Sequence, residues 1–188
     1  SSDQIVIEFL QKVTPDVSQK KSENDLIYIS TSTLCELGRL NAYHQKVLEY
    51  IISILEKQVY VNHDPDSITH LIDLSKISPF YINKQLNYCL TKLKNEHPPE
   101  KCIYEVFSSL SNNLSQGDVT SLFNELIALS NSNDDQQFRN LLEMVTIKCQ
   151  KKLNDDEVSI IIDKFSKDDE GWRALLNIFE HRHSNLLS

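Results

Sequence analysis

Apolar residues recur along this chain at positions i, i+3, i+4 and i+7, and the pattern restarts every 14 to 21 residues. Each copy is one apolar stripe on a short helix, which must bury that stripe against another element. We therefore expect these side chains, Trp172 included, to form the core. The clearest stripes are Leu48/Ile51/Ile52/Leu55, Leu86/Cys89/Leu90/Leu93, Ile103/Val106/Phe107/Leu110, Val119/Leu122/Phe123/Leu126, Phe138/Leu141/Leu142/Val145, Val158/Ile161/Ile162/Phe165 and Trp172/Leu175/Leu176/Phe179.

The composition favours helices over strands. The 188 residues include only 3 glycines and 5 prolines, and each glycine inside a helix costs about 1 kcal/mol. No segment keeps an alternation of period two, and neither Asn-Gly nor Asp-Gly marks a hairpin. The sequence predicts an all-α protein of about ten helices, the first of them around Ile5 to Val13.

Alternate stripes are evenly spaced. One series, with spacings of 41, 35, 35 and 34 residues, opens at Ile27, Ile68, Ile103, Phe138 and Trp172. The intervening series, with spacings of 38, 33 and 39, opens at Leu48, Leu86, Val119 and Val158. A repeated unit of 33–41 residues predicts an α-solenoid of antiparallel helix pairs; a compact bundle of unequal helices is the alternative. We assign residues 1–22 to an N-terminal helix and linker and residues 23–188 to the helical-repeat domain.

Polar residues between the stripes have the positions of helix caps. Single caps are expected at Asn24, Asn41, Asp64 before Pro65, and Ser78 before Pro79. His97-Pro98-Pro99-Glu100 is expected to break one helix and open the next. Capping boxes, in which two residues cap each other's backbone, are expected at Ser115/Asp118, Ser132/Asp135 and Asn154/Glu157.

Two segments, Ile29–Lys57 (ISTSTLCELGRLNAYHQKVLEYIISILEK) and Leu114–Leu142 (LSQGDVTSLFNELIALSNSNDDQQFRNLL), share a polar cap, an apolar helix, a short polar loop and a second amphipathic helix. This spacing resembles the degenerate helical repeats of organellar proteins, of the heptatricopeptide and octotricopeptide type often found with RAP domains. The resemblance covers roughly residues 24–182. It implies RNA binding, or a place in a mitochondrial assembly such as a ribosome.

The net charge and the pattern of cysteines restrict the expected partners and the expected cellular compartment. The net charge of −8 and a pI near 5.2 oppose binding to nucleic acid by the molecule as a whole. No apolar run approaches the length of a membrane span, so no membrane partner is expected. The chain starts with Ser1 rather than Met, and we interpret it as a processed product or a fragment. We interpret the isolated cysteines as reduced core thiols in a reducing compartment, either the mitochondrial matrix or the cytoplasm: Cys35, Cys89, Cys102 and Cys149.

The sequence carries no motif of a known enzyme class. Phosphate-binding glycine loops and the G-x-S-x-G nucleophile motif are absent. His181 and His183 stand two residues apart and cannot share a helix face. Asn131-x-Asn133-x-Asp135 resembles the start of a calcium loop, but Gln136 stands where that loop needs glycine. We expect no enzyme activity, no metal, no cofactor and no small-molecule substrate; a helical enzyme with a site built from distant residues is a third reading.

Two basic groups near helix ends are candidate contact sites. We expect a non-catalytic scaffold or adaptor that binds a protein partner or a ribonucleoprotein surface, with an organellar RNA-binding repeat protein as the alternative. RNA or partner contact would fall on two sets of side chains, Tyr88, Lys92, Lys94, Lys101 and Tyr104, and Lys148, Lys151 and Lys152.

Overall fold

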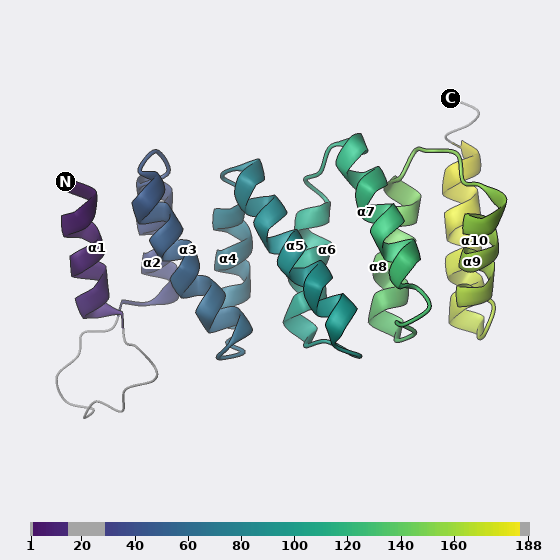
Figure 1. Cartoon of the computed structure of the whole chain (residues 1–188), viewed down its shortest axis with the longest axis horizontal. Helices are drawn as coiled ribbons and strands as arrows, with labels where there is room; N and C mark the ends of the chain where they lie inside the picture. The colour runs from purple at the N-terminus through teal and green to yellow at the C-terminus, as the bar shows by residue number, and fades with distance from the viewer. Residues whose placement is uncertain (1, 15–28, 185–188) are drawn as a thin grey trace. The chain divides into compact units, whose positions relative to one another are not determined.

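The computed structural model describes residues 2–14 and 29–184, and within these ranges it contains ten α-helices and no strand (Figure 1). The prediction of an all-α protein is confirmed. The chain divides into two compact units, Ser1–Ile82 and Asn83–Ser188. The helices are α1 (Ser2–Val13), α2 (Thr31–Leu40), α3 (Gln45–Tyr60), α4 (Asp66–Ser75), α5 (Pro79–Asn95), α6 (Lys101–Ser111), α7 (Gln116–Leu129), α8 (Gln136–Lys148), α9 (Asp155–Phe165) and α10 (Asp169–Ser184).

In the first unit α1 and α2 each pack against the helix two positions further along the chain. Helix α2 packs on α4, α1 packs on α3, and α3 also contacts both α2 and α4. Polar side chains support the same pairs: Arg39 of α2 forms an ion pair of 3.2 Å with Asp73 of α4. His44, just before α3, places Nδ1 3.0 Å from the Asp3 carboxylate of α1. The buried stripe of α3 fills the space between these helices.

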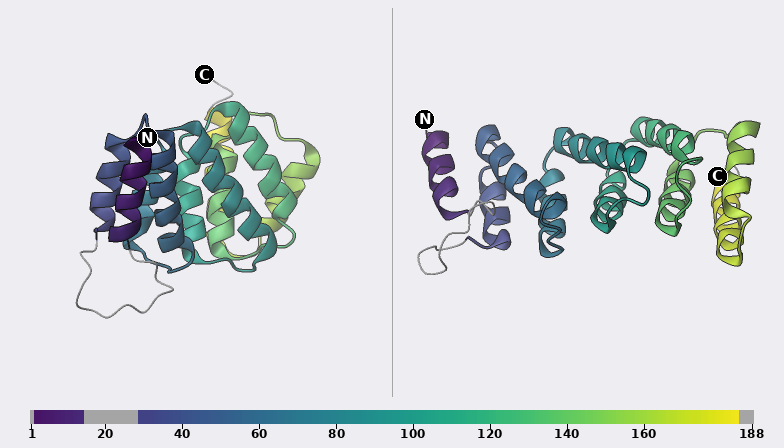
Figure 2. Two further views of the ribbon diagram at one scale, coloured as in Figure 1. Left: turned by 60° about the vertical axis from the view of Figure 1, so that its left-hand side comes forward. Right: turned by 60° about the horizontal axis from the view of Figure 1, so that its bottom comes forward.

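The second unit repeats this arrangement. Helix α8 packs on both α6 and α10, while α7 covers α8 and α9 covers α10. Figure 2 shows α5 and α7 on one side of α6 and α8. Phe107, Phe123, Phe138 and Phe165, from four successive helices, are fully buried. Side chains also meet across the repeat, as in the 2.6 Å hydrogen bond from Asn177 to Glu143, 34 residues apart.

The packing has the period expected from the sequence. Helices α2, α4, α6, α8 and α10 begin at intervals of 35, 35, 35 and 33 residues. Helices one period apart are in contact in four cases: α1 with α3 and α2 with α4 in the first unit, and α6 with α8 and α8 with α10 in the second. This packing is consistent with a helical repeat, and the solenoid arrangement stays a prediction.

Most of the expected caps form. The Asp64 carboxylate accepts the backbone N–H of Asp66 at 3.2 Å, and the Ser78 hydroxyl accepts that of Phe80 at 3.3 Å. Ser115 caps α7 through the N–H of Asp118. The pair Asn154/Glu157 forms a complete capping box at the start of α9. The break at residues 97–100 separates α5 from α6 as expected.

Two cap predictions are wrong. Asn41 ends α2 instead of opening α3, because its amide donates back to the carbonyl of Leu37 at 2.7 Å. Ser132 is not the cap of α8; Asp135 itself accepts the N–H of Phe138. Helix α2 begins at Thr31, with Ser30 as its N-cap. Asn24 and Ile27, and most of the predicted linker, lie outside the described residues.

Two predicted apolar stripes, those of α9 and α10, include side chains that are exposed in the structure. Trp172 is 53 % exposed, and the exposed side chains beside it on the same helix face are Leu176 and Phe179. The buried face of α10 instead contains Gly171, Leu175 and Ile178, one residue out of phase with the prediction. The reason is that α10 turns towards α8 and α9, where Gly171 lies directly against the end of α9. Ile162 of α9 is exposed as well.

The cysteines lie where the sequence placed them. All four are free and buried, which confirms them as core thiols. Burial raises the pKa of the Cys35 and Cys102 thiols, so both are held in the neutral form. Core packing explains these residues without a metal or a redox role.

We predict that Gly171→Ala lowers the free energy of unfolding by about 2–3 kcal/mol. A Cβ atom at this position would stand 1.9 Å from the carbonyl oxygen of Phe165, so the α9–α10 turn would have to move. Gly117→Ala is the matched control, because a Cβ there meets only open space and the Ser115 hydroxyl at 3.9 Å. It should leave stability unchanged or raise it by less than about 1 kcal/mol. Urea denaturation followed by circular dichroism measures both; equal effects would contradict the packing of this turn.

Candidate protein-binding groove

The first predicted basic group is largely paired within its own helices. Lys92 places Nζ 2.6 Å from the Glu96 carboxylate and 5.7 Å from the centre of the Tyr88 ring. The hydrogen bond to Glu96 raises the pKa of Lys92. Lys101 forms a longer pair, 3.3 Å, with Glu105. A phosphate would have to compete with these carboxylates.

Tyr104 holds two helices together and is only 5 % exposed. Its hydroxyl donates to the Asp135 carboxylate, 2.8 Å away, at the N-terminus of α8. Burial, together with this hydrogen bond, raises the pKa of Tyr104 far above its usual range. Tyr104 therefore joins α6 to the cap of α8 and offers little surface to a ligand.

The second basic group surrounds the end of α8. Lys151 donates to the Glu157 carboxylate at 2.5 Å and to the Asn124 side chain at 2.9 Å. Burial lowers the pKa of Lys148, which has no ion pair within the described ranges. Arg182, which the sequence did not single out, donates to the carbonyls of residues 146, 149 and 151 that α8 leaves open. Of the eight candidates, only Lys94, Lys148 and Lys152 are cations without an ion pair among residues 2–14 and 29–184.

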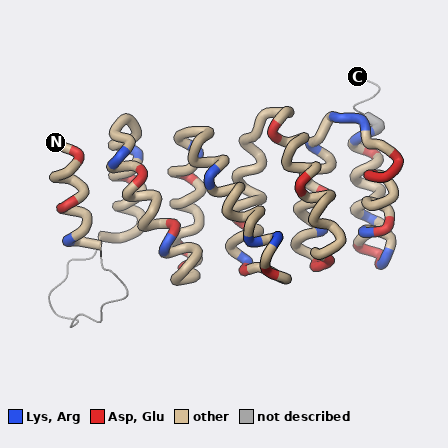
Figure 3. The backbone as a smooth tube through the Cα atoms, in the orientation of Figure 1, with Lys and Arg blue, Asp and Glu red and all other residues tan. Residues whose placement is uncertain are grey.

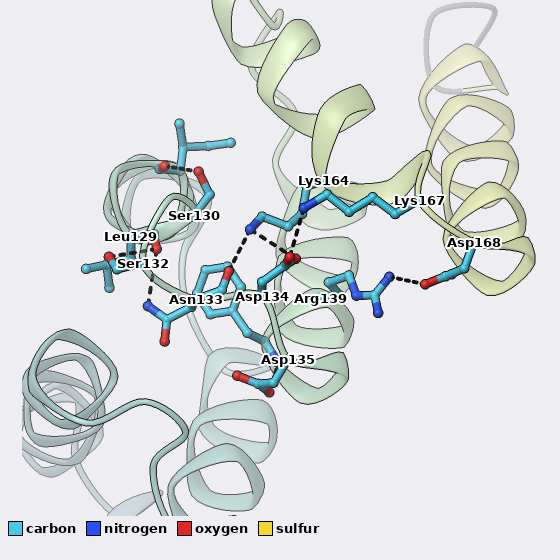
Figure 4. A network of polar contacts seen from close by, with 12 residues as sticks. Leu129, Ser130, Ser132, Asn133, Asp134, Asp135, Arg139, Lys164, Lys167 and Asp168 are labelled. Atoms are coloured by element: carbon cyan, nitrogen blue, oxygen red, sulfur yellow. Dashed lines mark hydrogen bonds and ion pairs between the residues drawn. The ribbon is translucent and has the colours of Figure 1, made fainter.

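A buried polar network forms at the loop between α7 and α8 (Figure 4). Asn133, 2 % exposed, donates its amide to the carbonyls of Leu93 and Leu129, at 3.1 and 3.2 Å. Its side-chain oxygen lies 3.1 Å from the His97 ring. Lys164 of α9, whose side chain is 7 % exposed, donates to the Asn133 carbonyl at 2.7 Å. Asn133 and Lys164 therefore satisfy polar groups of helix α5, helix α7, the α5–α6 loop and the α7–α8 loop.

The acidic residues beside Asn133 are also engaged. Asp134 accepts from Lys167 at 2.8 Å and lies 3.3 Å from Lys164. The hydrogen bond from Lys167 lowers the pKa of Asp134. Asp135 is the N-cap of α8. These contacts account for the segment that resembled a calcium loop, with capping and helix linkage as its role.

Lys164 was missed by the sequence reading, although the sequence carries a signal for it. It stands between Ile161 and Phe165, at a position where the buried stripe of α9 would have an apolar residue. A charged residue at such a position is seldom buried unless it is paired or hydrogen-bonded. The carbonyl of Asn133 and the carboxylate of Asp134 supply those partners.

An open groove of about 600 Å³ lies between α5 and α7. Leucines form its floor: Leu86 and Leu122 are buried, and Leu90, Leu114 and Leu129 are half-buried. The rims are polar and differ in charge (Figure 3). On α5 the rim consists of Asn83, Asn87, Thr91 and Lys94; on α7 it consists of Asp118, Ser121, Glu125 and Ala128.

A second cavity, of about 330 Å³, lies between α8 and α10 and has both polar and apolar walls. Two of its charged side chains, Arg139 and Glu143, have partners in the protein. Arg139 forms a 2.7 Å ion pair with Asp168 and so lowers the pKa of that carboxylate. Glu143 accepts from Asn177. The Nε of Arg139 is the one buried side-chain nitrogen or oxygen in the described ranges without a hydrogen-bond partner.

Comparison with known protein families, characterised sequences and solved structures finds no significant match to this chain. Across the part of the chain that the structure describes, no helix is long and apolar enough to cross a membrane. The same residues contain no group of three or more His, Cys, Asp or Glu side chains placed to hold a metal ion. What the chain binds must therefore be inferred from the shape and charge of its own surfaces.

We predict that Asn133→Ala lowers the free energy of unfolding by roughly 2–3 kcal/mol, because two buried carbonyls and a histidine lose their partner. Asn131→Ala provides the control, since Asn131 is exposed and lies in the same loop. Chemical denaturation compares the two variants. A loss from Asn133→Ala no larger than that of the control would show that the network contributes little.

We also predict acid sensitivity at Glu157, a buried carboxylate that is 8 % exposed. Burial raises its pKa, but the hydrogen bonds from Lys151 and from the Asn154 backbone outweigh burial and bring the pKa below 4.5. The stabilisation is therefore complete above pH 4.5 and is lost as the pH falls through the lower folded-state pKa. Glu157→Gln should cost about 1–3 kcal/mol at pH 7 and progressively less towards acid.

Denaturation curves at a series of pH values measure the difference between wild type and Glu157→Gln. Asp156→Asn is the control, because Asp156 is exposed in the same helical turn and should cost less than about 1 kcal/mol. A difference between wild type and Glu157→Gln that stays constant with pH would refute the linkage.

Proposed function

We propose that this chain is a non-catalytic helical-repeat protein that binds another polypeptide, as an interaction subunit of a larger assembly. The observation that carries the proposal is the α5–α7 groove. Three of the leucines along it remain half-exposed, and the polar rims on both sides are open to solvent. Elongated grooves with an apolar floor and polar edges are typical sites for peptide segments.

The polar clusters of the second unit support a structural rather than a catalytic role. The carboxylates of Asp135, Glu157 and Asp168 accept hydrogen bonds from helix N-termini. Each of these groups is also bound by a tyrosine, lysine or arginine of the protein. Their ionisation serves helix capping and helix linkage, which needs no substrate.

The RNA-binding alternative receives less support from the geometry. Lys92, Lys101 and Lys151 each have a carboxylate partner, and the net charge is −8. If such a lysine bound a phosphate, its existing ion pair with a carboxylate would be broken for each new contact with a phosphate. The resemblance to organellar repeats favours a mitochondrial ribonucleoprotein assembly as the setting, with contact through protein. Free, buried cysteines fit a reducing compartment.

Site-specific photo-crosslinking tests the proposal in cells that express the full chain. A photoreactive phenylalanine replaces Thr91 on the groove rim or, as the control, the exposed Thr69 on α4. The Thr91 probe should give a discrete crosslinked protein that Thr69 does not, and Leu90→Glu should remove it. Abundant crosslinking of the chain to RNA at 254 nm, with no protein adduct at Thr91, would favour the alternative and overturn the proposal.

A further inference from the structure

We infer that the groove between α5 and α7 receives one amphipathic helix of about three turns, with an apolar face and a basic flank directed at α7. This inference rests on the proposed function and names the class of partner. Its occupant is a segment of another protein. The inference is carried by the spacing of the lining residues, by the leucine floor and by the unequal charge of the rims.

The lining residues follow one face of each helix over the same length. On α5 they stand at 83, 86, 87, 90, 91 and 94, and on α7 at 118, 121, 122, 125, 128 and 129. Both sets keep helical spacing across 12 residues, from 83 to 94 and from 118 to 129, which corresponds to about 17 Å of helix. A third helix of three turns placed along this channel would contact both faces from end to end. A compact small molecule would use only part of it.

The two helices that form the walls of the groove, α5 and α7, stand further apart than the corresponding helices of the first unit, α1 and α3. Helix α1 packs directly on α3, whereas α5 and α7 are not among the helix pairs in close contact. The resulting channel exposes parts of Leu90, Leu114 and Leu129. Apolar side chains at i, i+3, i+4 and i+7 of a partner helix would cover them, as the chain's own helices cover one another.

The charges on the rims specify the polar flank of that partner. Asp118 and Glu125, two turns apart on α7, have no cationic partner among the described residues; Asp118 accepts a hydrogen bond from the Ser115 hydroxyl. The facing rim on α5 carries no acid; it has the neutral amides Asn83 and Asn87 and, at its far end, Lys94. Lysine or arginine at positions seven apart on the partner helix would therefore pair with α7 and not with α5.

The same charges favour one orientation. Helices α5 and α7 run in the same direction (Figure 1), so Asp118 stands near the beginning of the channel and Lys94 near its end. A helix N-terminus carries partial positive charge and its C-terminus partial negative charge. The partner helix would place its N-terminus beside Asp118 and its C-terminus beside Lys94, parallel to both walls.

Fluorescence anisotropy on the full chain tests this inference with a stapled, labelled peptide of about 14 residues. The probe carries leucines at i, i+3, i+4 and i+7 and lysines seven apart on one flank. One control peptide has the leucines scrambled at constant composition, and the other has glutamate in place of lysine. We expect binding of the probe and at least about tenfold weaker binding of both controls at low salt.

A charge exchange identifies the surface. Asp118→Lys with Glu125→Lys should weaken the basic probe by about tenfold or more and favour the acidic peptide instead. The matched control is Asp156→Lys with Glu180→Lys, which makes the same change in net charge at exposed positions outside the groove; it should change affinity by no more than about twofold. Because these variants alter exposed residues only, circular dichroism should show an unchanged fold.

Three results would overturn the inference. These are equal binding of all three peptides, no reversal of preference in the groove variant, and a dimer that dissociates on Leu90→Glu, which would make a second copy the occupant. A Thr91 crosslink to a partner without peptide preference would leave the proposed function standing and remove only this inference. Peptide preference without any crosslinked partner would keep the groove's preference for a basic amphipathic helix and overturn the proposed function, and with it the claim that the occupant belongs to another protein.

Discussion

The structure depends on the inability of any single helix in this chain to bury its own apolar stripe. Each helix is short and amphipathic, so its stripe must be covered by other helices, as that of α3 is by α1, α2 and α4 and that of α8 is by α6, α7 and α10. The period of about 35 residues is therefore a packing requirement as well as a pattern. Contacts between successive repeats follow from it, because packing brings equivalent positions of neighbouring repeats side by side. Arg39 with Asp73 and Asn177 with Glu143 are two such contacts.

Close packing leaves the connecting loops with buried polar groups that must be satisfied, and the α7–α8 loop shows how. Asn133 bonds carbonyls from the end of α5 and from α7, while Lys164 of α9 bonds the carbonyl of Asn133. A half-satisfied network of this kind would be worse than an apolar one. Complete satisfaction makes the network selective for one arrangement of these segments.

Local rules predicted the helices and most caps, because a stripe and a cap are decided within a few residues. Which face of α10 is buried, by contrast, was not decided by nearby residues. Its sequence offers two apolar faces, one with Trp172 and Leu176 and the other with Leu175 and Ile178, and only contact with α8 and α9 selects the second. The pairing of Lys92 with Glu96 was readable from its i, i+4 spacing. The groove was not, because its width depends on the separation of two helices.

Two sets of apolar side chains in the second unit stay exposed, and they differ in the charged residues around them. Trp172, Leu176 and Phe179 on α10, and Ile162 on α9, have exposed sequence neighbours of both charge signs, namely Asp163, Arg173 and Glu180. The groove combines leucines with an acidic rim on one side and amides on the other. Apolar area supplies affinity with little direction, whereas unequal rims admit one polarity and one orientation. Specific recognition is therefore better placed in the groove, where the shape and the charge of a partner are both restricted.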